Sequence, residues 1–279
     1  MLILCYNNII MDNFPDVDEM PKPLGDEHGR GFNDKHFESP NLPGKIIKEA
    51  WELGANDQEK TDRAIDSSKA YLEMLTKSYG ISVAPHYFVI GPSLLGEGQA
   101  LFCIQDRIER STSLEALVKY GDSEALNAGA MLTGKVLDHV DDVIKKGGGL
   151  QPEFFRYDQY VFQKPSIDPD NFSGPSDRLI LVDTEPFAPL RVSVPEERRE
   201  KNDFSTIFWA LQICAEQVIE LAKHNRGEDT TRYLLSIVDS LPDSNGLKKV
   251  KDGVKDCVER RDFETLRTFL EEQEFPDSF

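Results

Sequence analysis

Asp183, at the end of an apolar run, is the residue of this sequence best placed to do chemistry. It follows four consecutive apolar residues in RLILVDTEP (178–186), and Pro186 ends the run. Four apolar residues in succession predict a strand that is buried on both faces. A strand that delivers a carboxylate at its exit can hold that carboxylate over a ligand. The alternative is an Asp that only caps the next turn, as at many strand exits.

A second group of polar residues lies upstream of Asp183, in SIDPDNF. Asn171 is twelve residues before Asp183, and Asp168 is three residues before Asn171. Carboxylate and amide oxygens are hard ligands of the kind that Mg²⁺ prefers, and a carboxylate can also accept a proton from a hydroxyl group. Asp158, in RYDQYVFQ, is a reserve candidate for proton acceptance. The alternative for DPDN is a proline-rich turn with Asx hydrogen bonds.

Glycines and a lysine in the first fifty residues could bind phosphate. Gly29 and Gly31 flank Arg30 and predict a glycine turn between two strands. Glycines let backbone N–H groups approach a phosphate closely, although an ordinary hairpin needs no such role. Lys48 ends a short predicted strand, Lys-Ile-Ile-Lys. The alternative is that Lys45 and Lys48 both face solvent, as lysines usually do.

Helices and strands must position these residues. A helix is predicted over 57–79, with a buried seam of Ile65, Ser68, Leu72 and Leu75 and a flank that carries Asp66, Lys69 and Glu73. Two strands follow, HYFVIG (86–91) and ALFCIQDRIE (100–109), and the second runs into polar Gln105-Asp106-Arg107.

The rest of the chain is predicted to be mainly helical. Short and long helices are predicted over 113–120 and 123–146, and His139 on the longer one is expected at the surface. A charged linker after Pro195 precedes a strongly apolar helix over 204–224. Three shorter helices are predicted near 228–240, 246–259 and 262–273.

Composition limits the classes of partner. The chain has 279 residues and a net charge of −18, which argues against nucleic acid or an anionic membrane as the main partner. No apolar run is long enough to span a membrane, and MLILCYNNII lacks the features of a signal peptide. The four cysteines are scattered without a CxxC motif, so we expect a reducing, cytoplasmic setting and no structural zinc site.

The order of these features resembles the protein-kinase-like fold, and more closely its compact bacterial aminoglycoside- and lipopolysaccharide-kinase-like branches. The resemblance is carried by FVIG, a variable loop, CIQDRIE and LVDTEP, and it covers roughly residues 25–190. It implies an α+β, bilobal fold with a small antiparallel β N-lobe that holds one helix, and a larger helical C-lobe. Residues 1–24 would then be an extended lead-in, 25–106 the N-lobe, and 107–279 the C-lobe with a catalytic and metal-binding hairpin over 151–186.

The resemblance also implies ATP and Mg²⁺ as cofactors and assigns roles. Asn171 and Asp183 would hold the metal ion, and Asp168, or else Asp158, would accept the proton of the acceptor hydroxyl. Lys48 would bind the α- and β-phosphates and pair with Glu73, or else with Asp66. The remaining nucleotide contacts would come from Gly29 and Gly31 over the phosphates and from Gln105 and Asp106 in a hinge beside adenine.

The sequence departs from the kinase pattern at several points. It has no HGD or HRD motif, it has Asp34 where a third loop glycine belongs, and it has Asp183-Thr184-Glu185 in place of DFG. The first hypothesis is a phosphotransferase that moves the γ-phosphoryl group of ATP to a hydroxyl of a small-molecule acceptor. A second is a pseudokinase, a binding or scaffold module without turnover. A third is an unrelated α+β interaction protein.

Overall fold

A computed structural model describes residues 22–23, 36–38, 42–53, 58–94, 97–146, 150–163, 175–184, 196–240 and 245–272. The protein is a mixed α+β chain with a small antiparallel sheet and a larger helical region, and it divides into two compact units. Unit 1 holds most of the strands and one helix, and unit 2 holds the other helices and a second small sheet. The predicted site residues Gly29, Gly31, Asp168 and Asn171 lie outside the described residues.

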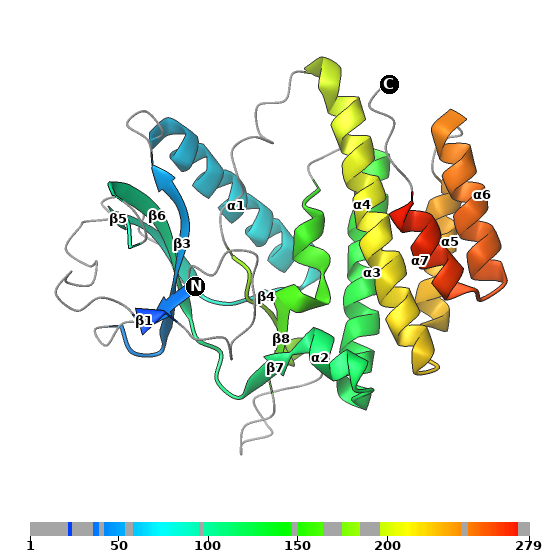
Figure 1. The fold of residues 1–279 in the computed structure, drawn as a ribbon, viewed down its shortest axis with the longest axis horizontal. Helices are drawn as coiled ribbons and strands as arrows, with labels where there is room; N and C mark the ends of the chain where they lie inside the picture. The colour runs from blue at the N-terminus through cyan, green and yellow to red at the C-terminus, as the bar shows by residue number, and fades with distance from the viewer. Residues whose placement is uncertain are drawn as a thin grey trace. The chain divides into compact units, whose positions relative to one another are not determined.

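A five-stranded sheet forms the centre of unit 1 (Figure 1). Its pairs are antiparallel, and the strand order is β1 (Lys22–Pro23), β2 (His36–Glu38), β3 (Lys45–Leu53), β6 (Gln99–Asp106) and β5 (His86–Pro92). The predicted strand that carries Lys48 is β3, and it lies next to β6. Strands β5 and β6, which were predicted after the helix, also lie next to each other.

Alternation of side chains gives this sheet two apolar faces. On one face Phe88, Leu101 and Cys103 pack with Ile65 of helix α1 (Gln58–Tyr79). On the other face Ile47, Val89, Ala100, Phe102 and Ile104 form a second cluster. Helix α1 has the predicted extent and ends before Gly80, which has a φ of 61°. A positive φ is readily adopted by glycine and stops the helix there.

The small sheet of unit 2 has the strand order β4 (Ser82–Val83), β9 (Leu179–Leu181), β8 (Tyr160–Gln163) and β7 (Ser111–Ser113). Strand β9 lies within the predicted strand of four apolar residues, LILV (179–182). Leu179 and Leu181 are buried, but Ile180 is only partly buried, so the strand is not covered on both faces as predicted.

Helices make up most of unit 2. They are α2 (Leu114–Lys119), α3 (Ser123–Lys146), α4 (Glu196–Lys223), α5 (Glu228–Ser240), α6 (Asn245–Glu259) and α7 (Phe263–Glu271). Helices α3 and α4 run side by side, and α5, α6 and α7 pack next to them (Figure 1). Helix α4 begins at Glu196, so the residues that were predicted as a charged linker form the first turns of this helix. Glu, Arg and Lys are good helix formers, which explains the difference.

His139 on α3 is buried, and the prediction of a surface histidine is wrong. The residue is only 4% exposed, and its ring packs against Phe155 with ring centroids 5.7 Å apart. Its Nδ1 lies 3.1 Å from the Tyr79 hydroxyl, which donates to Asp142 at 2.9 Å. Because the single Tyr79 proton goes to Asp142, His139 Nδ1 is the donor in its own contact with Tyr79. Burial lowers the pKa of His139 to about 4.

Three cysteines, Cys103, Cys214 and Cys257, are buried free thiols, as the sequence predicts for apolar surroundings. Burial raises the pKa of the Cys214 thiol well above its ordinary value. Within the described residues, no helix has the length and apolar character needed to cross a membrane.

Candidate functional site

Lys48 is a buried lysine on a central strand of unit 1. Only 6% of it is exposed, whereas lysine is almost never buried without a compensating interaction. It lies opposite Cys103 on β6, which in turn lies opposite Phe88 on β5. Side chains that are directly opposite share a face of the sheet. Lys48 therefore belongs to the face that α1 covers, and the alternative of a solvent-facing Lys48 is excluded.

His86 and Lys69 lie near Lys48 on this face. His86 is opposite Gln105, which is two residues along β6 from the Cys103 partner of Lys48 and so on the same face. Burial lowers the pKa of His86, and the positive charges of Lys48 and Lys69 lower it further. Lys48 on β3 and Lys69 on α1 are thus both close enough to His86 to act on it electrostatically. A lysine ammonium group is a suitable partner for an anion such as phosphate.

Gln105 and Cys103 hold the residue that follows Asp183. The Thr184 hydroxyl donates to Gln105 Oε1 at 2.9 Å and lies 3.3 Å from Cys103 Sγ. All three side chains are almost completely buried. The chain passes from unit 2 to unit 1 between Asp183 and Thr184. Gln105 therefore anchors Thr184, a role that its position in a polar run at a strand end did not indicate.

The other predicted hinge residue, Asp106, is also engaged within unit 1. Its carboxylate pairs with Lys45, which lies opposite it on β3. Its backbone N–H donates to the Pro85 carbonyl at 2.8 Å, and the N–H of Arg107 donates to the Gly44 carbonyl at 2.9 Å. These two backbone donors of the predicted hinge are thus used inside the protein.

Glu73, predicted to pair with Lys48, lies on the exposed side of α1. Its side chain is 60% exposed and forms an ion pair with Lys77 one turn along the helix. Asp66, the second choice, is exposed as well. The α1 residue Lys69 acts electrostatically on His86, as Lys48 does.

The pairing of β8 with β9 decides which residues lie beside Asp183 in unit 2. Tyr160 is opposite Leu181, and the Val182 N–H donates to the Gln159 carbonyl at 2.9 Å. In an antiparallel pair, residues before the first strand lie at the same end as residues after the second. Asp158 and Gln159 are therefore at the Asp183 end of this hairpin. A pairing of the strand-forming runs YVFQ and LIL could have been proposed from the sequence, and it would have placed Asp158 near Asp183. The partner predicted for Asp183 was instead Asn171.

Asp158, the reserve catalytic candidate, is held by an arginine. Arg156 donates to it twice, from Nε to Oδ1 at 3.1 Å and from Nη2 to Oδ2 at 2.6 Å. Such a two-pronged, charged contact fixes the orientation of a carboxylate. Within the residues that the structure describes, no three His, Cys, Asp or Glu side chains group closely enough to hold a metal ion.

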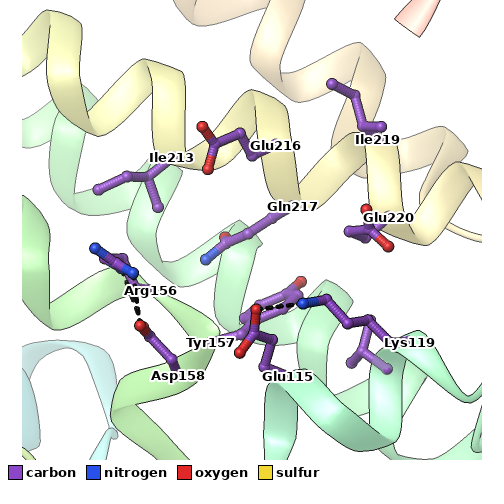
Figure 2. A pocket seen from close by; sticks show the side chains of 11 residues that line it. Glu115, Lys119, Arg156, Tyr157, Asp158, Ile213, Glu216, Gln217, Ile219 and Glu220 are labelled. Atoms are coloured by element: carbon purple, nitrogen blue, oxygen red, sulfur yellow. Dashed lines mark hydrogen bonds and ion pairs between the residues drawn. The ribbon is translucent and has the colours of Figure 1, made fainter. Parts of the chain in front are cut away.

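A pocket with a volume of about 240 Å³ lies next to Asp158 in unit 2 (Figure 2). Residues of α2, the 3₁₀ turn η4 (Tyr157–Gln159) and α4 line it. None of its α2 or α4 residues was a candidate from the sequence, because helical spacing alone does not show which helices meet.

Comparisons with known proteins assign no family. No protein-family model and no curated protein matches the chain. Among solved structures it is similar to one described as "WaaP in complex with acyl carrier protein". The two are 15% identical with a TM-score of 0.32, and the similarity covers 83% of this chain and 88% of that chain. These values are too low for an argument about function.

Proposed function

We propose that the protein is a kinase-like, bilobal phosphotransferase that uses ATP and Mg²⁺ and transfers the γ-phosphoryl group to a hydroxyl of a small-molecule acceptor. The main support is the buried Lys48 on β3, under α1 and together with Lys69 and His86. Transfer of a phosphoryl group needs positive charge on the nucleotide phosphates and little covalent chemistry from the protein. In this proposal Lys48 binds the α- and β-phosphates.

Hard oxygen ligands for Mg²⁺ are available at the end of the β8–β9 hairpin. Asp183 provides a carboxylate, and Gln159 provides an amide oxygen at the same end of the hairpin. Asn171 remains the ligand predicted from the sequence. This donor set fits a metal that prefers oxygen, and the bound ion would neutralise charge on the phosphates.

The reaction itself is a substitution at the γ-phosphorus. A bond forms between that phosphorus and the acceptor oxygen, and the bond to the β–γ bridging oxygen breaks, which releases ADP. The hydroxyl proton passes to a carboxylate, for which Asp168 and Asp158 are the candidates. Asp158 would have to exchange its contact with Arg156 for one with the acceptor.

Specific observations favour a pseudokinase as the second candidate. Glu73 pairs with Lys77, and the backbone donors of Asp106 and Arg107 bind carbonyls of unit 1. A protein that keeps these contacts would not assemble the usual lysine–glutamate pair of an active kinase. It would bind nucleotide without turning it over, or would not bind it.

Turnover of ATP with water as the acceptor separates the two candidates. We expect slow, Mg²⁺-dependent production of ADP by the wild type, and a loss of roughly 100-fold or more in Asp183→Asn, which keeps the side-chain shape but removes its charge. Asp252→Asn, at an exposed position on α6, is the control and should turn over ATP like the wild type. Equal rates in Asp183→Asn and the wild type, or rates independent of Mg²⁺, would contradict the proposal.

A further inference from the structure

Three buried polar side chains form a chain of hydrogen bonds between α3, η4 and α4, which we call the α3–α4 network. Thr133 of α3 is fully buried, Gln217 of α4 is 4% exposed and Tyr157 of η4 is 6% exposed. The Thr133 hydroxyl lies 2.8 Å from the Tyr157 hydroxyl and 2.8 Å from Gln217 Oε1. At the other end of the network, Gln217 Nε2 donates to the Phe155 carbonyl. All of these residues belong to unit 2.

The positions of the protons in the α3–α4 network follow from what each group can donate or accept. The Phe155 carbonyl can only accept, so it receives a proton from Gln217 Nε2, and Gln217 Oε1 is the acceptor of that amide. The Thr133 hydroxyl donates to Gln217 Oε1 and also lies 3.0 Å from the Gly129 carbonyl of its own helix. Because Thr133 has only one proton, the Tyr157 hydroxyl is the donor in its contact with Thr133.

The α3–α4 network attaches the chain at two points just before Asp158. One point is the Phe155 carbonyl, bound by Gln217, and the other is the Tyr157 side chain, bound by Thr133. In Figure 2, Gln217 extends from α4 toward the turn that carries Tyr157 and Asp158. Because peptide units are planar and rigid, two attachments so close together restrict the main chain of Asp158.

The chain is also held just after Asp158. The Gln159 carbonyl accepts from the Val182 N–H at 2.9 Å, within the β8–β9 hairpin. Tyr160 is fully buried, and its hydroxyl donates to the Phe154 carbonyl at 2.8 Å. The main chain of Asp158 is therefore fixed from both sides.

Packing alone does not require the α3–α4 network. Apolar side chains of similar size could fill the space between α3 and α4, and a buried hydrogen bond adds little net stability compared with such packing. What hydrogen bonds add is direction, because a fully satisfied buried network makes its surroundings rigid and selects one arrangement. In this protein the arrangement that is selected is that of the turn with Asp158.

We propose that the α3–α4 network positions Asp158 as the group that accepts the proton of the acceptor hydroxyl. The inference rests on the proposed phosphotransferase function, and it assigns this role to Asp158 and not to Asp168. The network fixes the main chain of the turn and not the carboxylate, so Asp158 can exchange its contact with Arg156 for one with the acceptor. A displacement of about 1 Å at a reacting group can lower a rate by about 100-fold, so such positioning matters for catalysis.

Thr133→Val tests the network, because valine keeps the shape of threonine but removes the hydroxyl that joins Tyr157 to Gln217. The assay is Mg²⁺-dependent production of ADP from ATP by the full-length protein, with water as the acceptor. We expect kcat to fall roughly tenfold or more, while KM for ATP changes less than about twofold. Thr133→Ser, which keeps a hydroxyl, should retain kcat within about threefold of the wild type.

Thr231→Val is the matched control. The Thr231 hydroxyl contacts the Gly227 carbonyl at 2.9 Å, much as the Thr133 hydroxyl contacts the Gly129 carbonyl, but it takes no part in the α3–α4 network. This variant should produce ADP like the wild type.

A double variant separates positioning of Asp158 from a general loss of structure. Asp158→Asn alone should lower kcat roughly 100-fold or more, because it removes the proton acceptor. Since the network acts through Asp158, adding Thr133→Val to Asp158→Asn should lower kcat by less than about twofold further. Thermal unfolding is measured for every variant, so that all rates refer to folded protein. If Thr133→Val does not fold, Tyr157→Phe removes the hydroxyl at the other end of the contact and decides the outcome by the same comparison.

Two results would overturn the positioning proposal while the phosphotransferase function stands. One is a kcat of folded Thr133→Val equal to that of the wild type, and the other is a double variant in which the two losses multiply. Absence of ADP production by the wild type would overturn both proposals.

Discussion

Burial determines the chemistry of several individual side chains in this protein. Lys48 is kept almost completely out of solvent on β3, and burial lowers the pKa of both His86 and His139. Burial also raises the pKa of Tyr157, whose hydroxyl lies 2.8 Å from that of Thr133. None of these effects follows from residue type alone, because a lysine or histidine on a strand or helix is most often exposed.

The buried His139 makes the stability of the protein depend on pH. Its pKa is about 4 in the folded state and about 6.5 in the unfolded state. Below pH 6.5 the unfolded state therefore binds a proton that the folded state does not, and stability falls as the pH falls from 6.5 toward 4. The contribution from this one residue is a loss of about 2 kcal/mol between pH 7.5 and pH 5.

Urea unfolding of the wild type and of His139→Phe at these two pH values measures this contribution. The variant keeps an aromatic ring beside Phe155 but has no group that titrates there. We expect the wild type to lose about 2 kcal/mol more than the variant between pH 7.5 and pH 5. Equal losses in the two proteins would show that His139 is not buried in its neutral form.

At the scale of helices and strands, periodic patterns predicted most of the architecture. The sequence gives the bounds of α3 and α5 correctly, because a helical stripe of apolar residues ends at a glycine or begins at a capping residue. It misplaces the start of α4, since charged residues such as Glu196 and Arg198 suit both linkers and exposed helices. It also overstates the burial of β9, because four apolar residues do not reveal which neighbours cover them.

Pairing between distant segments was the harder part of the site to predict. The sequence predicted Lys48 on a strand and Asp183 after the end of one, and the structure has Lys48 on β3 and Asp183 two residues after β9. It did not predict that Asp158 and Gln159 reach the Asp183 end of the hairpin, because this depends on the register of β8 with β9. Gln105 was predicted beside a nucleotide but binds Thr184, which depends on how the chain returns to the sheet.

Two glycines within helices should respond to substitution in opposite directions. A Cβ at Gly253 of α6 would lie 2.7 Å from Cε1 and Cε2 of Phe269 on α7, whereas a Cβ at Gly134 of α3 would meet no atom within 4 Å. We expect Gly253→Ala to destabilise the protein by about 1–2 kcal/mol, because the ring must move. We expect Gly134→Ala to stabilise it by about 0.5–1 kcal/mol, because alanine is the better helix former.

Thermal unfolding of the two variants and the wild type tests this pair. The expected order of midpoints is Gly134→Ala, then wild type, then Gly253→Ala. A Gly253→Ala midpoint at or above that of the wild type would mean that α6 and α7 do not pack as closely as described.

At the scale of the whole molecule, the two units carry complementary parts of the proposed chemistry. Unit 1 provides the buried Lys48, and unit 2 provides the hairpin that is followed by Asp183. The phosphotransferase proposal assigns a role to each, so it predicts that nucleotide binding needs the lysine and the metal ligand together.

Calorimetric titration with ATP, with and without Mg²⁺, tests this central claim most directly. The proteins are the wild type, Lys48→Met, Asp183→Ala and the control Asp252→Asn. We predict Mg²⁺-dependent binding by the wild type and the control, binding weakened roughly tenfold or more by Lys48→Met, and loss of the Mg²⁺ dependence in Asp183→Ala. Tight binding that needs no metal and survives Asp183→Ala would indicate a pseudokinase. No binding of ATP by the wild type would contradict the phosphotransferase proposal outright.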